Sequence, residues 1–160
     1  MKKVYRAIAG RIRTELQELA RVVERTTHIW QQAVVSADDY YVDATALNLH
    51  GFYAGIERVL EIIADGIDQV KPSGPYWHQE LLRQMAAEIP GVRPSVLSLE
   101  TRDQLDRYRG FRHIVRHVYT FNFDVEQIEV LVKQLLPTME RVSRELLGFA
   151  DFLEQLAEED

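Results

Sequence analysis

The sequence predicts an all-α fold: one up-and-down bundle of four long helices and one short helix, covering residues 1–160 as a single domain. Apolar residues recur at steps of three or four along most of the chain, which is the period of an amphipathic helix. No stretch alternates between apolar and polar residues as a half-buried strand does. A chain of this length can bury one full hydrophobic core.

The first half of the chain predicts two long helices. The first covers about residues 4–34, where the apolar residues keep helical spacing. The polar segment 36–39 provides a capped start for the second. The apolar positions of this second helix extend to residue 70, and the proline- and glycine-containing segment 72–75 ends it.

Two helices are expected in the middle of the chain. A short one covers residues 76–88, and two prolines and a glycine within residues 90–94 end it. Ser98 is placed to cap a longer helix over residues 99–121.

The last helix is expected to start at Asp124, which forms a capping-box pattern with Gln127 three positions later. Its apolar stripe extends to Leu153. Pro137 interrupts this stripe, and because proline lacks a backbone N–H, the sequence predicts a kink there.

Composition limits the possible functions. The chain has no cysteine, which excludes disulfides and thiolate chemistry and fits a reducing compartment. Arg6, Arg11 and Arg13 interrupt the N-terminal region before an apolar run long enough for a signal peptide or a membrane span can form. We therefore expect a cytoplasmic protein with no membrane partner.

The net charge of −6 argues against general nucleic-acid binding, but the charges are unevenly distributed. Residues 102–117 contain five arginines and two aspartates, whereas residues 151–160 contain five acidic residues and no basic one. The segment 102–117 is therefore the candidate for contact with phosphate groups.

The predicted helix over residues 99–121 has two different faces. At about 100° per residue, one side is an apolar core stripe made of Tyr108, Phe111, Ile114, Val115, Val118 and Phe121. The other side gathers cations, imidazoles and a phenol: Arg109, Arg112, His113, Arg116, His117, Tyr119 and Thr120. Histidine and arginine are the groups that metal-free RNA cleavage needs, because one can take a proton from a ribose 2′-hydroxyl and the other stabilises the phosphorane charge.

The segment Arg112-His113-Ile114-Val115-Arg116-His117-Val118-Tyr119 matches the pattern Arg-x4-His-x-Tyr. In an all-helical chain of this length, it resembles the HepT-type HEPN ribonuclease toxins. The resemblance implies a HEPN-like bundle and a homodimer whose two motifs face each other across a cleft. It also implies metal-independent endoribonuclease activity, with transfer RNA as a candidate substrate. The implied partner is a minimal nucleotidyltransferase antitoxin, as in the HepT/MntA pairs.

The resemblance assigns roles to individual residues. Arg112 becomes the phosphate-stabilising cation, His117 the general base, and Tyr119 the tyrosine to which the antitoxin transfers AMP groups. Arg109, His113 and Arg116 are the supporting residues expected to contact RNA. His113 departs from the family pattern, since asparagine is common at that position.

The pattern leaves a geometric problem, because Arg112 and His117 lie roughly 140° apart around one helix. A long side chain or a second subunit must bring them together. His113 and His117 also stand at a spacing that suits zinc, but no carboxylate is placed to complete the site. We therefore expect no metal ion and no cofactor.

A competing hypothesis is a non-catalytic HEPN module that binds a nucleotidyltransferase and helps to hold its substrate. The intact Arg112, His117 and Tyr119 favour the enzyme, because a scaffold needs none of that chemistry. His50 and His78 are expected at the surface or at an interface. His78 stands beside Trp77 in the sequence, so a role in shaping a cleft is an open alternative.

Overall fold

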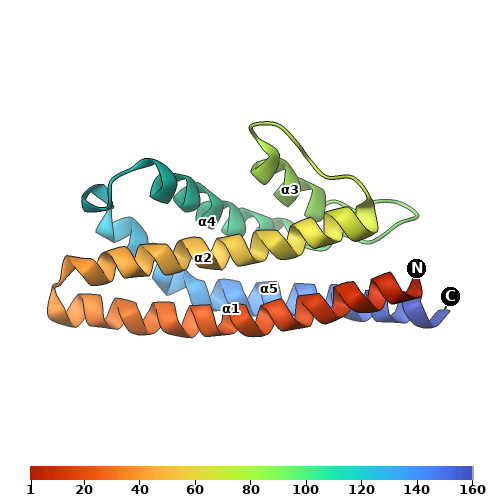
Figure 1. The fold of residues 1–160 in the computed structure, drawn as a ribbon, viewed down its shortest axis with the longest axis horizontal. Coiled ribbons are helices and arrows are strands. Elements are labelled where there is room, and N and C mark those ends of the chain that lie inside the picture. Colours follow the sequence, from red (N-terminus) through yellow and green to blue (C-terminus); the bar gives the residue numbers. More distant parts are fainter. Residues whose placement is uncertain (160) are drawn as a thin grey trace.

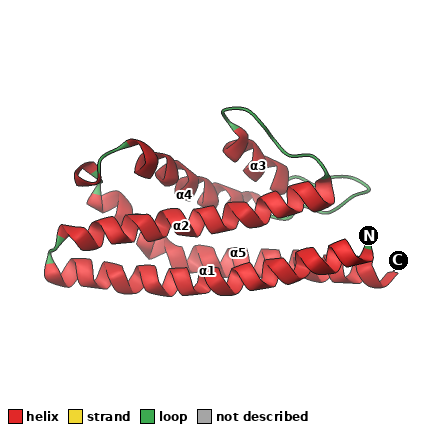
Figure 2. Ribbon diagram, in the orientation of Figure 1, coloured by secondary structure: helices red, strands yellow, loops and turns green. Residues whose placement is uncertain are grey.

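The computed structural model describes residues 1–159, and Asp160, the last residue of the acidic tail, lies outside them. Within the described residues the regular structure is entirely helical (Figure 2). The α-helices are α1 (Lys2–Ser36), α2 (Asp39–Ile63), α3 (Trp77–Met85), α4 (Leu99–His117) and α5 (Val125–Glu159). A π-helical turn, η1 (Ala64–Asp68), extends α2, and a 3-10 turn, η2 (Thr120–Asn122), lies between α4 and α5. The predicted all-α bundle of four long helices and one short one is confirmed.

The long helices run up and down along one axis (Figure 1). α1 packs against both α2 and α5, and α4 covers the other side of α2. The short α3 packs on α4 and α2. Both termini lie at the same end of the molecule (Figure 1). Within residues 1–159, no helix is long and apolar enough to cross a membrane.

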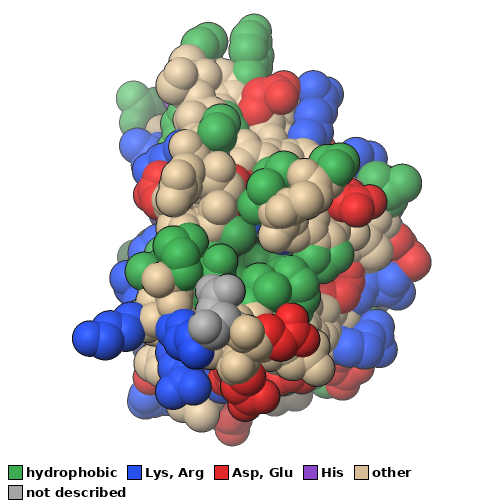
Figure 3. All heavy atoms as spheres, turned by 90° about the vertical axis from the view of Figure 1, so that its right-hand side faces the viewer, with side chains coloured by type: hydrophobic (Ala, Val, Ile, Leu, Met, Phe, Trp, Pro, Cys, Tyr) green, Lys and Arg blue, Asp and Glu red, His purple; other side chains and the backbone are tan. Residues whose placement is uncertain are grey.

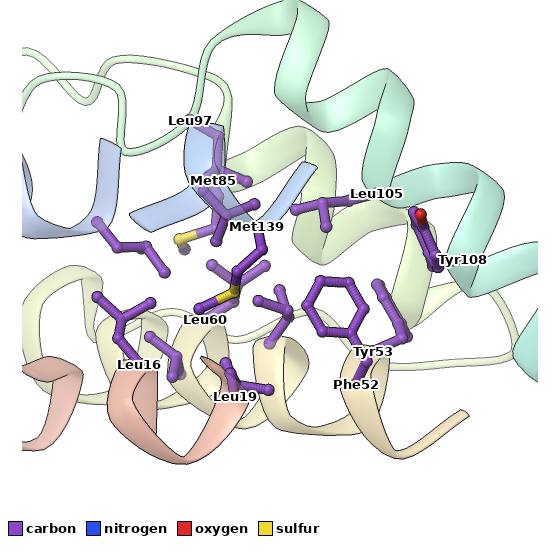
Figure 4. Close-up of a cluster of buried hydrophobic side chains, with 14 of the residues drawn as sticks. Leu16, Leu19, Phe52, Tyr53, Leu60, Met85, Leu97, Leu105, Tyr108 and Met139 are labelled. Carbon is purple, nitrogen blue, oxygen red and sulfur yellow. The ribbon is translucent and has the colours of Figure 1, made fainter. Parts of the chain in front are cut away.

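All five helices contribute to one apolar core. Figure 4 shows side chains of this core converging from different helices, among them Leu16, Leu19, Phe52, Tyr53, Leu60, Met85, Leu105, Tyr108 and Met139. The rings of Phe52 and Tyr108 meet edge to face, with centroids 5.3 Å apart. The Tyr108 hydroxyl donates a hydrogen bond of 2.7 Å to the Leu131 carbonyl, and burial raises the pKa of Tyr108 to about 12. This buried phenol therefore stays a neutral donor that fixes α4 to α5.

The predicted helix caps are present. The Asp38 carboxylate accepts from the Tyr40 N–H at 3.0 Å, and the Asp124 carboxylate accepts from the Glu126 N–H at 3.0 Å. At the start of α4, the Ser98 hydroxyl accepts from the Thr101 N–H at 3.2 Å. These contacts satisfy N–H groups that have no partner inside their own helix.

Ser98→Ala is expected to lower the free energy of unfolding by about 1 kcal/mol, because it removes the cap of α4. Equilibrium unfolding in urea, followed by circular dichroism, measures this change. Ser36→Ala is the control, since the exposed Ser36 hydroxyl donates to the Gln32 carbonyl inside α1 and accepts from the Asp38 N–H before α2, but from no N–H in the first turn of a helix. If neither variant changes the free energy of unfolding, Ser98 does not act as a cap.

The second helix ends differently from the prediction, which extended it to residue 70. Regular α-helix stops at Ile63, a wider π-helical turn follows, and Gln69 adopts a left-handed conformation with φ of 56°. The turn directs the Asp68 carboxylate toward Arg93, with Nε 2.5 Å from Oδ1 and Nη2 2.8 Å from Oδ2. The π-helical turn therefore aligns a buried acceptor for a distant arginine.

Arg93 fixes the end of α3. Besides Asp68, its guanidinium donates to three backbone carbonyls, those of Gln84, Ala87 and Pro94. All five guanidinium N–H groups thus have an acceptor. α3 stops at Met85, three residues before the predicted end, because its last carbonyls bond to this side chain and to the N–H groups of the following loop.

The fourth helix is also shorter than predicted. α4 ends at His117, and Val118 is extended, with φ of −122° and ψ of 155°. β-Branched and aromatic residues follow one another from Val118 to Phe121, and these have lower helix propensity than straight-chain residues. Phe121, predicted to lie in the core, is 82% exposed, and Val118 is exposed as well. The core stripe of α4 ends with the half-buried Val115.

α5 continues through Pro137 as one uninterrupted helix, and the expected kink there stays a prediction.

Arg13 of α1 bonds to Asp151 at 2.7 Å and Glu154 at 3.2 Å, which ties part of the acidic C-terminal segment to the bundle. The end of the molecule where both termini lie shows basic and acidic side chains side by side (Figure 3). This mixture does not form a single-sign surface for nucleic acid.

Candidate functional site

A groove of about 520 Å³ lies between the start of α3 and the second half of α4. One wall carries the predicted polar residues of α4, namely Arg109, Arg112, His113, Arg116 and His117. The facing wall is formed by the loop before α3 and its first turn, namely Pro75, Tyr76, Trp77, His78 and Gln79. The structure therefore brings every predicted site residue that belongs to α4 to one concave surface.

Arg112 and His117 line this groove together, although they lie on different sides of α4. One concave surface therefore includes residues from both margins of the polar arc. The Arg112 side chain is half-buried, and its Nε has no hydrogen-bond partner among the described residues. A buried, unpaired guanidinium N–H favours an incoming anion, because leaving it unpaired costs free energy.

The His117 ring is held in one tautomer. Its Nδ1 lies 2.7 Å from the carbonyl oxygen of His113, one helical turn earlier. Because a carbonyl only accepts hydrogen bonds, Nδ1 must carry a proton, and Nε2 of the neutral ring keeps its lone pair. The rings of His113 and His117 also stack, with centroids 4.1 Å apart. Nε2 of His117 is thus the nitrogen that can accept a proton from a ligand.

The arginines of the groove differ in their partners. Arg109 Nε is bound to the Asp106 carboxylate at 2.6 Å, which offsets part of its charge. In the described part of the chain, Arg112 and Arg116 form no ion pair with a carboxylate. The cationic character of the groove therefore comes mainly from these two residues.

α2 contributes a polar side chain close to the groove arginines, and no pattern in the sequence indicated it. His50 of this helix is half-buried rather than at an open surface. Burial, and then the charges of Arg112 and Arg116, lower the pKa of His50 below its ordinary value. His50 is therefore a neutral side chain beside the arginines at neutral pH.

His78 belongs to the site, in agreement with the alternative that it shapes a cleft. Its Nδ1 lies 2.7 Å from a carboxylate oxygen of Glu57, which is only 5% exposed, and its ring lies against that of Trp77 with an angle of 30° between the planes. The sequence offered one weak signal for this contact, namely a glutamate next to Ile56 on the apolar face of α2. A carboxylate in such a position needs a partner.

Tyr119 lies apart from the other predicted residues. It follows the end of α4, is 74% exposed, and does not line the groove. Its ring stacks on Phe121, with centroids 5.6 Å apart and an angle of 8° between the planes. The tyrosine is therefore accessible to a modifying enzyme, two residues beyond His117.

The described residues contain no group of three or more histidine, aspartate or glutamate side chains that could hold a metal ion. His113 and His117 thus form a pair without a third protein ligand. The expectation of metal-independent chemistry stays a prediction.

The up-and-down all-α fold is consistent with a HEPN-type helical bundle. A family model described as HepT-like protein matches residues 44–153, which include the whole Arg-x4-His-x-Tyr segment. The chain belongs to the HepT-like family. Membership implies a HEPN-type toxin of a toxin–antitoxin pair, with a nucleotidyltransferase antitoxin as partner. No curated protein and no solved structure matches the chain.

Proposed function

We propose that this HepT-like protein is a metal-independent endoribonuclease that cuts RNA in the groove between α3 and α4. The observation that carries the proposal is the fixed His117 tautomer, which leaves Nε2 free to accept a proton in the groove that Arg112 also lines. A general base and a fixed cation are the two groups that cleavage at a ribose 2′-hydroxyl requires.

In the proposed reaction, His117 Nε2 takes the proton of the 2′-hydroxyl and the 2′-oxygen attacks the adjacent phosphorus. The new O2′–P bond forms while the P–O5′ bond breaks. The products are a 2′,3′-cyclic phosphate and a free 5′-hydroxyl. Arg112 stabilises the charge that develops on the phosphorane oxygens, and its unpaired Nε supports this role.

Arg109, His113 and Arg116 are proposed to hold the RNA backbone beside the reacting phosphate. Arg116 offers an unpaired cation, whereas Arg109 is already bound to Asp106. Transfer RNA is the candidate substrate class. Incubation of the purified protein with total transfer RNA and a chelator tests the activity, followed by a substrate without the 2′-hydroxyl at the cut site. Cleavage of the second substrate, or of neither, would contradict the proposal.

The protein is also proposed to act as a homodimer with its two grooves facing one another. The exposed apolar ring of Phe121 at the end of α4 supports a contact with a second copy that leaves the Tyr119 hydroxyl accessible. Sedimentation equilibrium measures the oligomeric state, and a strictly monomeric protein that still cleaves RNA would contradict the need for a dimer.

Tyr119 is proposed to be the switch through which the antitoxin silences the toxin. Each transferred AMP adds a negative phosphate and a bulky base beside the cationic groove, which opposes RNA binding by charge and by size. Exposure of the phenol supports access by a nucleotidyltransferase.

Tyr119→Phe is expected to keep RNA cleavage within a few-fold of the unmodified protein while resisting the antitoxin, because the change removes only the acceptor hydroxyl. Mass spectrometry after incubation with the antitoxin and ATP measures the modification, and a cleavage assay measures the activity. Tyr76→Phe is the control, because Tyr76 is a second exposed tyrosine near the groove. An antitoxin that still modified and silenced Tyr119→Phe would show that the switch lies elsewhere.

A further inference from the structure

RNA cleavage of the proposed kind needs a second proton transfer, which His117 does not provide. As the P–O5′ bond breaks, the leaving 5′-oxygen must gain a proton, because an alkoxide is a poor leaving group in water. A general acid for this step must lie on the far side of the phosphorus from the base, since the entering and leaving oxygens are roughly in line.

His78 lines the groove on the wall opposite His117. It lies in the first turn of α3, on the wall of the groove that faces α4, whereas His117 and His113 share the α4 wall. His113 stacks directly on His117, so it lies on the same side as the base. Of the three imidazoles that line the groove, His78 alone faces the base from across the groove.

The contacts of His78 fix which nitrogen faces the groove. A carboxylate only accepts hydrogen bonds, so the 2.7 Å contact with Glu57 requires a proton on Nδ1. Nδ1 therefore points toward α2, and Nε2 is the nitrogen left for a ligand. Trp77 covers one ring face, with ring centroids 3.7 Å apart. The imidazole is thus held at one edge and on one face, as a proton-transfer group requires.

Glu57 is a buried carboxylate on α2. It stands among the apolar residues of α2 with 5% of its surface exposed, and a carboxylate there is costly without a partner. The Glu57 carboxylate accepts a hydrogen bond from His78, an imidazole that lines the groove.

We propose that His78 is the general acid of the ribonuclease reaction and that Glu57 is the residue that positions it, an inference that rests on the proposed function. In this step His78 starts as the imidazolium, with its Nδ1–H bound to the Glu57 carboxylate, and its Nε2 donates the second proton to the 5′-oxygen as the P–O5′ bond breaks. Meanwhile His117 Nε2 takes the proton of the 2′-hydroxyl as the O2′–P bond forms. One proton enters the protein and one leaves it, and exchange with water restores both imidazoles.

The test compares two RNA substrates that share the cut site mapped with the wild-type protein. In one, the leaving atom is the natural 5′-oxygen; in the other, sulfur replaces it. A thiol has a pKa of about 8.5, far below that of an alcohol, so a thiolate leaves without a general acid. The sulfur substrate therefore bypasses the step assigned to His78.

His78→Asn is the informative variant, because the asparagine amide can donate to Glu57 from the place of Nδ1 but has no group in the place of Nε2. It is expected to slow cleavage of the oxygen substrate by about 10² to 10⁴, and to slow cleavage of the sulfur substrate by less than about tenfold. His117→Ala is expected to lower the cleavage rates of both substrates. His28→Asn is the matched control, since His28 is an exposed histidine of α1 away from the groove and should leave both rates unchanged.

Glu57→Gln provides a second variant that keeps the imidazole. It is expected to lower the cleavage rate of the oxygen substrate by about tenfold and to leave the cleavage rate of the sulfur substrate unchanged, because the imidazole loses only its positioning partner. If His78→Asn and Glu57→Gln lower the cleavage rates of both substrates equally, or lower neither rate, His78 is not the general acid. If the wild-type protein cleaves neither substrate, the proposed function itself fails. The two failures are therefore distinguishable.

Discussion

His117→Ala is expected to lower the rate of RNA cleavage by about 10² to 10⁴ and to leave the bundle folded. The His117 side chain is exposed, and its hydrogen bond goes to the His113 carbonyl of its own helix, so its removal opens no cavity in the core. The change removes the nitrogen that we propose as the acceptor of the 2′-hydroxyl proton, while Arg112 and the rest of the groove remain. Initial rates on transfer RNA in the presence of a chelator measure the effect.

The matched control is His28→Ala, which removes an exposed histidine from α1. This variant should keep the full rate and the same circular dichroism spectrum. Expression in cells without the antitoxin provides a second readout, because His117→Ala should relieve growth arrest and His28→Ala should not. Undiminished cleavage by folded His117→Ala would refute the assignment of the general base.

Asp68→Ala is expected to lower the free energy of unfolding by about 3 to 5 kcal/mol, the largest effect on stability that we predict. The side chains of Asp68 and Arg93 are both fully buried, and the substitution leaves the guanidinium as an uncompensated charge in the interior. Two of the five hydrogen bonds of Arg93 are lost as well. Equilibrium unfolding in urea measures the difference.

Glu80→Ala is the control for this prediction. It breaks the pair between Glu80 and Arg83, which is largely exposed and should contribute less than about 1 kcal/mol. A similar decrease in the free energy of unfolding for both variants would contradict a larger stabilising contribution from the buried pair. Because Arg93 holds the end of α3, Asp68→Ala should also disturb the wall of the groove that carries Trp77 and His78. A lower cleavage rate is therefore expected even at temperatures where the variant stays folded.

Much of the fold could be predicted from the sequence, because helices depend on local patterns. Apolar spacing gave the number and order of the helices, and the caps at Asp38, Ser98 and Asp124 were found where expected. Helix ends were less predictable. The π-helical turn at Ala64–Asp68 places the Asp68 carboxylate against a buried arginine from a distant loop. No local sequence pattern predicts this contact.

The candidate site was predictable only along a single helix. The polar residues of α4 from Arg109 to His117 were identified from their spacing, and five of them line one groove. Tyr119 was expected on the same helix face but lies beyond the helix end. Glu57 and His78 stand 21 positions apart on different helices, so no short motif links them.

The sequence by itself determined that the chain is all-helical and carries the Arg-x4-His-x-Tyr segment of the HepT-like family. Both properties are local, since a helix is closed by hydrogen bonds between residues four apart and a motif is read along one stretch of chain. Only the tertiary structure decided that α3 faces α4 across a groove, that Glu57 holds His78 there, and that His50 lies beside the arginines. Such contacts depend on how helices pack in space, and packing joins residues whose separation along the chain has no fixed value.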